Sequence, residues 1–208
     1  MKCYSYIIAR DYGFAPNPFG LYCTLATCKP GIRKRAVRDD WIIGTGSACG
    51  HGSERLVFAM KVAEKLDFNE YWSEPRFIYK KPVLNGSLKQ MYGDNVYVKR
   101  SGKWRQADSH HSHADGTENI HNLQRDTSQP YVLVSEHFYY FGRNAVAIPK
   151  RFREQNGLSI CKKGPGYRCH LPDVFVSGFI KWLENNHSPG YKGNPLLFTA
   201  FERYDGIS

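Results

Sequence analysis

The chain is organised around residues 39–62, which read DDWIIGTGSACGHGSERLVFAMKV. Residues 41–44 and 56–62 are short runs rich in aromatic and branched side chains, which predicts two β-strands. Between them lies a loop, residues 45–54, that includes three glycines. Hairpin loops usually have about 2–5 residues, longer loops are often functional, and glycine lets a backbone approach a ligand closely. This loop is therefore either one wall of a site for a base or nucleotide or a surface loop of small residues.

A second segment that could line the same site precedes this stretch. Residues 4–9 alternate and are rich in β-forming side chains, so they predict the first strand. Residues 10–20 hold two prolines and two glycines, which interrupt regular structure. The same segment carries Tyr12, Phe14 and Phe19, more aromatic rings than a solvated loop usually has. The rings either pack under the loop as a plug on the core or line a flat pocket.

The remaining segments predict a mixture of strands and helices. Strands are expected at 21–28, 95–99, 131–135 and 144–149, with 62–66 closing the strand at 56–62 and an extended course at 75–81. Helices are expected at 67–72, 151–158 and 173–184. Asp67 and Glu70 match a capping box at the start of the first helix. Residues 107–129 are polar without periodicity, which indicates a long loop that is mobile in part.

Positive charge is concentrated in two segments. The chain carries 29 basic and 19 acidic residues, a net charge of +10. Residues 76–105 hold eight basic residues against the single acid Asp94, and residues 29–38 add Arg33, Lys34 and Arg35. Such clusters attract polyanions and gain affinity for nucleic acid by counterion release, although a basic surface without a partner would have the same composition. The expected contacts to a nucleic-acid backbone are Arg33, Lys34, Arg35, Arg76, Lys80 and Lys81.

Composition is that of a globular protein. The 208 residues suffice for a large core, and 41% hydrophobic with 23% charged residues is typical of this class. No apolar run reaches the roughly 18 residues of a membrane span, and residues 1–10 are too short and interrupted for a signal peptide. We therefore expect a cytoplasmic protein that contacts no membrane, with its six cysteines as free thiols.

Familiar catalytic and nucleotide-binding motifs are absent. Residues 44–46 match neither a P-loop nor GxGxxG, because no Lys-Ser/Thr follows and no helix is expected after them. The residue types of a hydrolase triad are present, but without a nucleophile elbow. On an extended chain His111 and His113 would face one way and could ligate a metal, although a polar loop explains the same residues. We predict no metal site and no cofactor.

A base-binding pocket requires aromatic faces for stacking, amides or carboxylates for the base edge, and cations for phosphate. The chain is 14% aromatic, and most of its rings will pack in the core. Trp41 is expected there, because it lies within a strand. The candidates for catalysis are Asp11, Asp40 and His111. The expected ligand contacts are Tyr12, Phe14, Asn17, Thr45, Gly46, Ser47, Trp104 and Gln106.

Segments 4–6, 11–19, 23–30 and 40–47 resemble a known family, the second of the nucleotide-modification-associated domains of bacteria and phages. The resemblance implies a role in DNA base modification or a related conflict system, with DNA or a nucleotide and further proteins of that system as partners. It supplies no established catalytic residue. At the level of fold, residues 39–64 are also similar to PUA-like barrels of the EVE and ASCH groups, which bind RNA or flipped modified bases. Asp39 stands where those domains have glycine.

These patterns predict one α+β domain over residues 1–208, with a mixed, PUA-like barrel-type sheet within 1–150 and a helical C-terminal part. Its expected function is recognition of a modified or extruded base. Two alternatives stay open: an enzyme that modifies or hydrolyses a base or nucleotide in a modification or defence system, and a partner-binding subunit that docks on DNA. The sequence does not decide between DNA, RNA and a signalling nucleotide, nor the oligomeric state.

Overall fold

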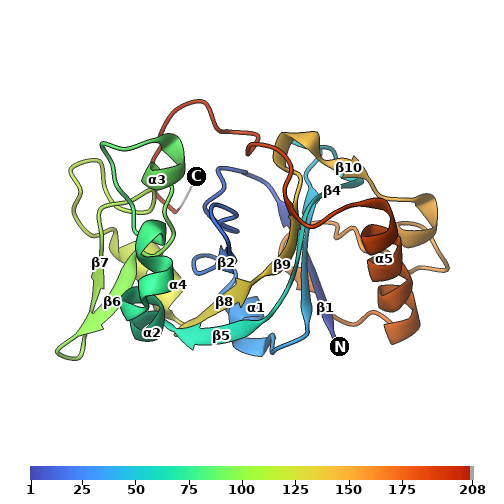
Figure 1. The fold of residues 1–208 in the computed structure, drawn as a ribbon, viewed down its shortest axis with the longest axis horizontal. Coiled ribbons are helices and arrows are strands. Elements are labelled where there is room, and N and C mark those ends of the chain that lie inside the picture. Colours follow the sequence, from blue (N-terminus) through green and yellow to red (C-terminus); the bar gives the residue numbers. More distant parts are fainter. Residues whose placement is uncertain (207–208) are drawn as a thin grey trace. The chain divides into compact units, whose positions relative to one another are not determined.

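The two strands predicted around the glycine loop, β3 (Trp41–Gly46) and β4 (Arg55–Lys61), pair antiparallel at the centre of a seven-stranded sheet. The strand order is β11-β1-β3-β4-β9-β12, and β10 also pairs with β4. Figure 1 labels β1, β4, β9 and β10 of this sheet. The other strands are β1 (Cys3–Ile8), β9 (His137–Tyr140), β10 (Val146–Ala147), β11 (Tyr167–Arg168) and β12 (Gly190–Tyr191).

The computed structural model describes residues 1–206, which divide into two units. Unit 1 comprises residues 1–11, 36–63 and 135–196 and contains the seven-stranded sheet. Unit 2 comprises residues 12–35, 64–134 and the described residues from Leu197 onward. Each unit is therefore assembled from three separate segments of the chain.

One face of the unit 1 sheet packs against helix α5 (Asp173–Asn186). The helix buries Phe175, Val176, Phe179, Ile180 and Leu183, the spacing of a single apolar face. These side chains form one cluster with residues of β3 and β4. Trp41 belongs to this cluster and is 1% exposed, which confirms that it packs in the core.

Unit 2 holds two smaller sheets and short helices. One sheet has the order β2 (Cys23–Leu25), β8 (Tyr131–Ser135), β5 (Glu64–Asp67), and the other is the hairpin β6 (Tyr97–Arg100) with β7 (Lys103–Gln106). The helices are α1 (Pro30–Arg35), α2 (Phe68–Ser73), η1 (Pro75–Lys80), α3 (Leu88–Met91) and α4 (Ile120–Thr127); η2 (Gly142–Asn144) and η3 (Lys150–Phe152) belong to unit 1.

The start of α2 confirms the predicted capping box. Asp67 accepts hydrogen bonds from the backbone N–H groups of Asn69 and Glu70, and the Glu70 carboxylate accepts from the Asp67 N–H. These bonds satisfy amides that a helix terminus otherwise leaves without partners.

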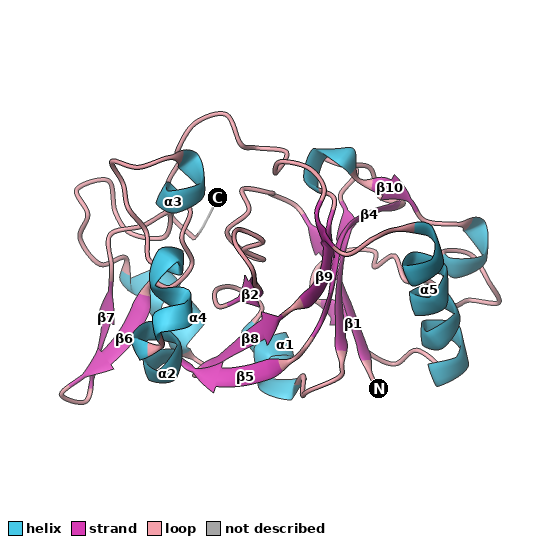
Figure 2. Cartoon of the chain, in the orientation of Figure 1, coloured by secondary structure: helices cyan, strands magenta, loops and turns pink. Residues whose placement is uncertain are grey.

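The α+β class is confirmed, and long loops join most of the elements (Figure 2). The expected barrel-type closure is wrong: within residues 1–206 each sheet is open, and the largest ends at β11 and β12. A barrel requires its two edge strands to pair with each other.

Four local predictions are also wrong. Residues 64–67 do not extend β4 but form β5, which pairs with β8. Residues 75–80 form the 3₁₀ helix η1, and the expected helix at 151–158 is reduced to η3. The polar segment 107–129 contains α4 and buries several of its side chains. Hydrogen bonding among buried polar groups holds this segment, which a hydrophobic pattern does not reveal.

Gly44 is a position in β3 where a side chain would collide. A Cβ atom there would lie 2.2 Å from a ring carbon of Phe58 and 2.8 Å from Ile8. Because both neighbours are buried, we expect Gly44→Ala to lower the free energy of unfolding by about 1–3 kcal/mol, measured by urea denaturation. Gly178→Ala on α5 is the control. Its Cβ would meet only Phe152, at 3.6 Å, so it should stabilise by up to about 1 kcal/mol. Unchanged stability of Gly44→Ala would contradict this packing.

Candidate functional site

Four strands of the unit 1 sheet end at the same edge. β1 is parallel to β3, β9 and β3 are both antiparallel to β4, and β12 is parallel to β9. Open sheets with parallel strands commonly bind ligands at the carboxyl ends of those strands. At or just beyond these ends lie Asp11, Ser47, Tyr140 and Tyr191. Together with His51, these residues are called the carboxyl-edge site below.

Asp11 is the polar centre of the carboxyl-edge site. Its Oδ2 lies 3.0 Å from His51 Nε2 and accepts from the backbone N–H of Leu196 at 3.2 Å, while its Oδ1 accepts from the Tyr140 hydroxyl. The side chains of Asp11 and His51 are each only 2% exposed. The carboxylate thus fixes the orientation of the imidazole. Within residues 1–206, His51 Nδ1 has no hydrogen-bond partner.

Ser47 opens the glycine loop at the end of β3. Its Oγ is buried and has no hydrogen-bond partner among the described residues. The backbone N–H groups of Gly50 and Gly52 both donate to the Ser47 carbonyl, at 3.2 and 2.9 Å, and fold the loop back onto the strand end. Gly46 is required here, because its Cβ would lie 2.2 Å from the Gly52 carbonyl oxygen. A buried hydroxyl without a partner is uncommon and marks a place where a ligand or water is expected.

Two tyrosines lie side by side at the ends of β9 and β12. The rings of Tyr140 and Tyr191 are parallel, with an interplanar angle of 1° and centroids 5.7 Å apart. Burial and the charge of Asp11 raise the pKa of Tyr191 to about 12, against the opposing charge of Arg143. The Tyr191 phenol is therefore protonated at neutral pH, and it donates to Asn194 Oδ1 at 2.6 Å.

The structure divides the predicted site residues between the units. Asp11, Thr45, Gly46 and Ser47 belong to unit 1 and lie at its carboxyl edge. Asp40 also belongs to unit 1 but precedes β3, where its carboxylate accepts from the backbone N–H groups of Lys2 and Val37 at 2.7 and 3.1 Å. The other ligand candidates belong to unit 2: Tyr12, Phe14, Asn17, Trp104 and Gln106, with the catalytic candidate His111.

In unit 2 the predicted aromatic residues pack against histidines. The rings of Tyr12 and Phe14 lie 4.8 and 4.9 Å from that of His110, and Phe14 lies 4.6 Å from His111. Phe14 is 3% exposed and His110 is 4% exposed. The rings of this segment were expected either to pack on the core or to line a flat pocket. Phe14 packs on the core.

The polar candidates of unit 2 are engaged in hydrogen bonds. Asn17 donates to the Tyr92 carbonyl at 2.8 Å, and its Oδ1 accepts from Lys80 at 2.7 Å. Gln106 donates to the Tyr97 hydroxyl at 3.2 Å and to a backbone carbonyl at 3.1 Å. Trp104 is half-buried, with its ring edge-on to Phe68 at 5.5 Å.

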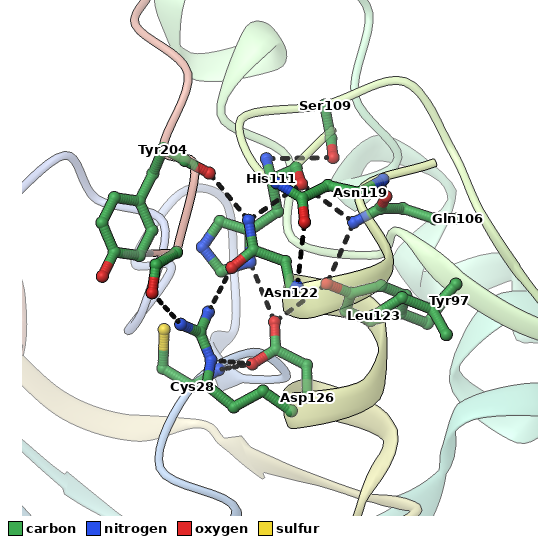
Figure 3. A network of polar contacts seen from close by, with 12 residues as sticks. Cys28, Tyr97, Gln106, Ser109, His111, Asn119, Asn122, Leu123, Asp126 and Tyr204 are labelled. Atoms are coloured by element: carbon green, nitrogen blue, oxygen red, sulfur yellow. Dashed lines mark hydrogen bonds and ion pairs between the residues drawn. The ribbon is translucent and has the colours of Figure 1, made fainter. Parts of the chain in front are cut away.

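His111 lies in a buried polar network (Figure 3). Its Nδ1 lies 2.8 Å from Asp126 Oδ2, and the same carboxylate accepts from the Tyr97 hydroxyl and the Cys28 N–H, each at 2.9 Å. Burial opposes the charge on His111, but Asp126 overcomes it and raises the pKa of the imidazole to about 9. Burial likewise opposes the charge on Asp126, yet His111, with Arg125 and Arg33, lowers the pKa of Asp126 to about 2. The pair is therefore ionised at neutral pH.

The six basic candidates for backbone contact lie in unit 2 and differ in exposure. Arg33 is fully buried, and its guanidinium donates to backbone carbonyls of Cys28, Asp126, Gln129 and Tyr131. Lys80 is 1% exposed and donates to Asn17 and to the Tyr22 carbonyl. Arg76 is paired with Glu64 at 2.7 Å, and the Lys81 ammonium lies 4.2 Å from the ring centroid of Trp72. Lys34 and Arg35 are exposed.

Within residues 1–206, no group of three His, Cys, Asp or Glu side chains is placed to hold a metal ion. Of the histidines considered for this role, His111 is buried and His113 exposed, so the two do not face one way. All six cysteines are free thiols, as predicted. None of the described helices has the length and apolar character needed to cross a membrane.

Comparison with protein families places the chain in a known family. The family described as nucleotide modification associated domain 2 matches residues 1–202 of the 208. The chain belongs to this family. The resemblance predicted from the sequence is thus confirmed. The match to this family covers segments of both units, including the carboxyl-edge site and the residues around His111. Neither the curated proteins nor the solved structures contain a match to the chain.

His51 and Tyr191 were not singled out by the sequence, and Tyr140 was not among the expected ligand contacts. His51 lies in the glycine loop, so a search for polar side chains within that loop would have found it. The two tyrosines carry no local signal that separates them from core aromatics. Their position becomes evident only from the pairing of β4 with β9 and of β9 with β12.

Proposed function

We propose that the carboxyl-edge site binds a nucleotide or an extruded, modified base, and that the chain serves a DNA-modification or defence system in this way. The family description supports the link to nucleotide modification. The observation that carries the proposal is the buried Ser47 hydroxyl, which has no partner within residues 1–206 and opens a glycine loop at the carboxyl ends of four strands. A hydroxyl offers one donor and two acceptor positions, which suits the edge of a base.

Other residues near the carboxyl ends of these strands carry the other groups that base recognition requires. The Tyr191 ring supplies a half-buried aromatic face, and the imidazole of His51 supplies a nitrogen with no partner among the described residues. Arg143 follows β9 and is exposed, so its guanidinium is available to a phosphate. Residues 48–50 and 53–54 of the glycine loop are exposed.

The Asp11–His51 pair favours the second candidate function, an enzyme acting on the base or nucleotide. A carboxylate that orients an imidazole through one nitrogen leaves the other nitrogen to accept or donate a proton. In that case His51 is the acid–base group and Asp11 the positioning residue.

Binding is tested by titrating free nucleotides and short labelled DNA, with modified and unmodified bases, at two salt concentrations. We expect Ser47→Ala to weaken binding about 5- to 10-fold, the effect of one hydrogen bond of roughly 1–1.4 kcal/mol. Because Ser47 Oγ makes no hydrogen bond within the described chain, the substitution should not lower stability. Ser53→Ala, an exposed position of the same loop, is the matched control and should bind as the wild type does.

Two outcomes would count against this proposal. If no nucleotide or DNA binds at low salt, the proposed base site is wrong. If Ser47→Ala binds with the same affinity as the wild type, Ser47 does not contact the ligand. Mass spectrometry of the recovered ligands separates binding from catalysis. Conversion by the wild type but not by His51→Gln assigns an activity, and unchanged ligand assigns a binding module.

A further inference from the structure

The hairpin formed by β6 and β7 in unit 2 ends in an exposed and strongly basic tip. Residues 99–105, called the hairpin tip below, read KRSGKWR and carry no acid and four cations: Lys99, Arg100, Lys103 and Arg105. All four of these residues are exposed, whereas Tyr97 and Gln106, at the other end of the same hairpin, are buried. Positive charge is therefore gathered on the part of the hairpin that faces solvent.

The base of the hairpin is fixed and its turn is open. The Tyr97 hydroxyl donates to Asp126 Oδ2 at 2.9 Å, and the Phe68 ring lies edge-on to those of Tyr97 and Trp104, with centroids 5.6 and 5.5 Å apart. At the turn, by contrast, a Cβ atom on Gly102 would meet nothing within 4 Å. Figure 2 shows this turn clear of helices α2 and α4 of the same unit. The tip can therefore contact a partner without any change at the base.

Strand register places like charges opposite each other in the hairpin tip. Arg100 pairs directly with Lys103, and Arg105, two residues further on, lies on the same face. Within residues 1–206, Lys99, Arg100 and Lys103 form no ion pair, and Arg105 has a long one, 3.8 Å to Glu118. Like charges directly opposite each other destabilise an antiparallel pair. The fold thus carries a repulsion that a bound polyanion would relieve.

The dimensions of the hairpin tip match the major groove of B-form DNA. That groove is about 12 Å wide and about 8.5 Å deep, and it admits a two-stranded β-ribbon. Residues 99–101, which lead from the buried part of β6 into the turn, span about 10 Å at roughly 3.3 Å per residue. The major groove of duplex RNA is deep and narrow, and side chains cannot read it. The shape therefore favours duplex DNA as the polyanion.

We propose that the hairpin tip of unit 2 inserts into the major groove of duplex DNA and places its four cations against the phosphates on either side. Cations that neutralise phosphates release counterions, so the affinity falls as salt rises and does not depend on base sequence. This surface is separate from the carboxyl-edge site of unit 1 and is inferred without it.

The test measures binding of a short labelled DNA duplex with unmodified bases to the full chain, at about 50 and 200 mM salt. The variant Lys99→Gln/Arg100→Gln/Lys103→Gln should bind about tenfold or more weakly than the wild type at the lower salt. Its plot of log affinity against log salt should be shallower by about 2.7, which is about 0.9 for each of three phosphates. The wild type should bind this duplex more tightly than an RNA duplex of the same sequence.

A matched control removes the same charge from unit 1. Arg151→Gln/Lys163→Gln/Lys181→Gln changes three exposed positions and should keep the salt dependence of the wild type.

Urea denaturation should show the hairpin variant to be at least as stable as the wild type, because the facing cations are gone. If it does not fold, Arg100→Gln/Lys103→Gln takes its place. That double variant keeps the Lys99 ammonium 5.8 Å from the ring centroid of Trp104.

Three results would overturn the proposal. They are no binding of duplex DNA by the wild type at the lower salt, equal losses in the control and the hairpin variant, and equal or tighter binding of the RNA duplex or of single-stranded DNA. Free nucleotides report on the carboxyl-edge site alone, so the hairpin variant should bind them as the wild type does. Failure of the hairpin tip is thus distinguished from failure of the proposed base site.

Discussion

Replacing Asp126 by alanine is expected to lower the free energy of unfolding by about 3–5 kcal/mol, because it removes one partner of a buried ion pair. The carboxylate is fully buried and accepts from His111, Tyr97 and the Cys28 N–H. Without it the imidazolium and three further donors, which include Arg125 Nε at 3.3 Å, lose their acceptor at once. In a chain of this size the loss corresponds to roughly 6–20 °C in melting temperature.

Amide hydrogen exchange measures the effect on unit 2 separately from unit 1, and urea denaturation measures the chain as a whole. Gln124→Ala is the matched control, since Gln124 is an exposed residue of the same helix α4. Its stability should lie within about 0.5 kcal/mol of the wild type. An Asp126→Ala variant as stable as this control would show that the network contributes nothing to the fold.

The His111–Asp126 ion pair also makes the stability of the fold depend on pH. The pKa of His111 is raised from 6.5 to about 9, so the native state binds more protons between these values and stability falls as the pH rises through them. The pKa of Asp126 is lowered from 3.8 to about 2, so its contribution is full above pH 3.8 and is lost as the pH falls through 2. Stability from the pair is therefore complete between about pH 4 and 6.5. In His111→Gln the decline above pH 6.5 should become shallower.

Replacing Lys80 by methionine is expected to lower the free energy of unfolding by a similar amount, about 3–5 kcal/mol. The Lys80 ammonium is buried and donates to Asn17 O, Asn17 Oδ1 and the Tyr22 carbonyl at 2.7–3.0 Å. Asp94 is fully buried and accepts from the hydroxyls of Thr24 and Tyr71; burial raises its pKa, and the charge of Lys80 opposes that rise. Removing the cation takes one donor from each of these three acceptors and leaves the carboxylate without this counter-charge.

A double-mutant cycle tests this coupling by urea denaturation. Adding Asp94→Asn to Lys80→Met should restore part of the stability, because the uncompensated charge is gone. Lys34→Met, at an exposed position of α1, is the control and should change stability by less than about 0.5 kcal/mol. Burial lowers the pKa of Lys80 to about 8, so the unfolded state binds more protons between pH 8 and 10.5 and this group adds stability as the pH rises there. A Lys80→Met chain with wild-type stability would refute the role.

Several elements follow from sequence because their causes are local. The hairpin β3–β4, the capping box of α2, the β6–β7 hairpin and helix α5 each depend on side chains within a few residues of one another. The burial of Trp41 follows in the same way from its place in an apolar strand. The family relationship, carried by segments in the first 50 residues, is also a property of the sequence.

Segment 107–129 is a part of the chain whose burial could not be predicted from its local sequence pattern. Its polar composition predicts a mobile loop, yet Ser109, His111 and Asn122 are buried because each finds hydrogen-bond partners. Burial by hydrogen bonding leaves no hydrophobic period in the sequence.

The sequence alone determined that a glycine loop follows a strand and that Asp11, Ser47 and His111 carry side chains able to bind a ligand or transfer a proton. It also determined that the chain belongs to the family of nucleotide modification associated domain 2. Only the tertiary structure decided which of these groups meet. His51 reaches Asp11 across 40 residues of sequence, and the Cys28 backbone reaches Asp126 across 98. The physical reason is that strand pairing and buried hydrogen bonds act through space, so the partner of a catalytic group is set by topology and carries no signal in its neighbours along the chain.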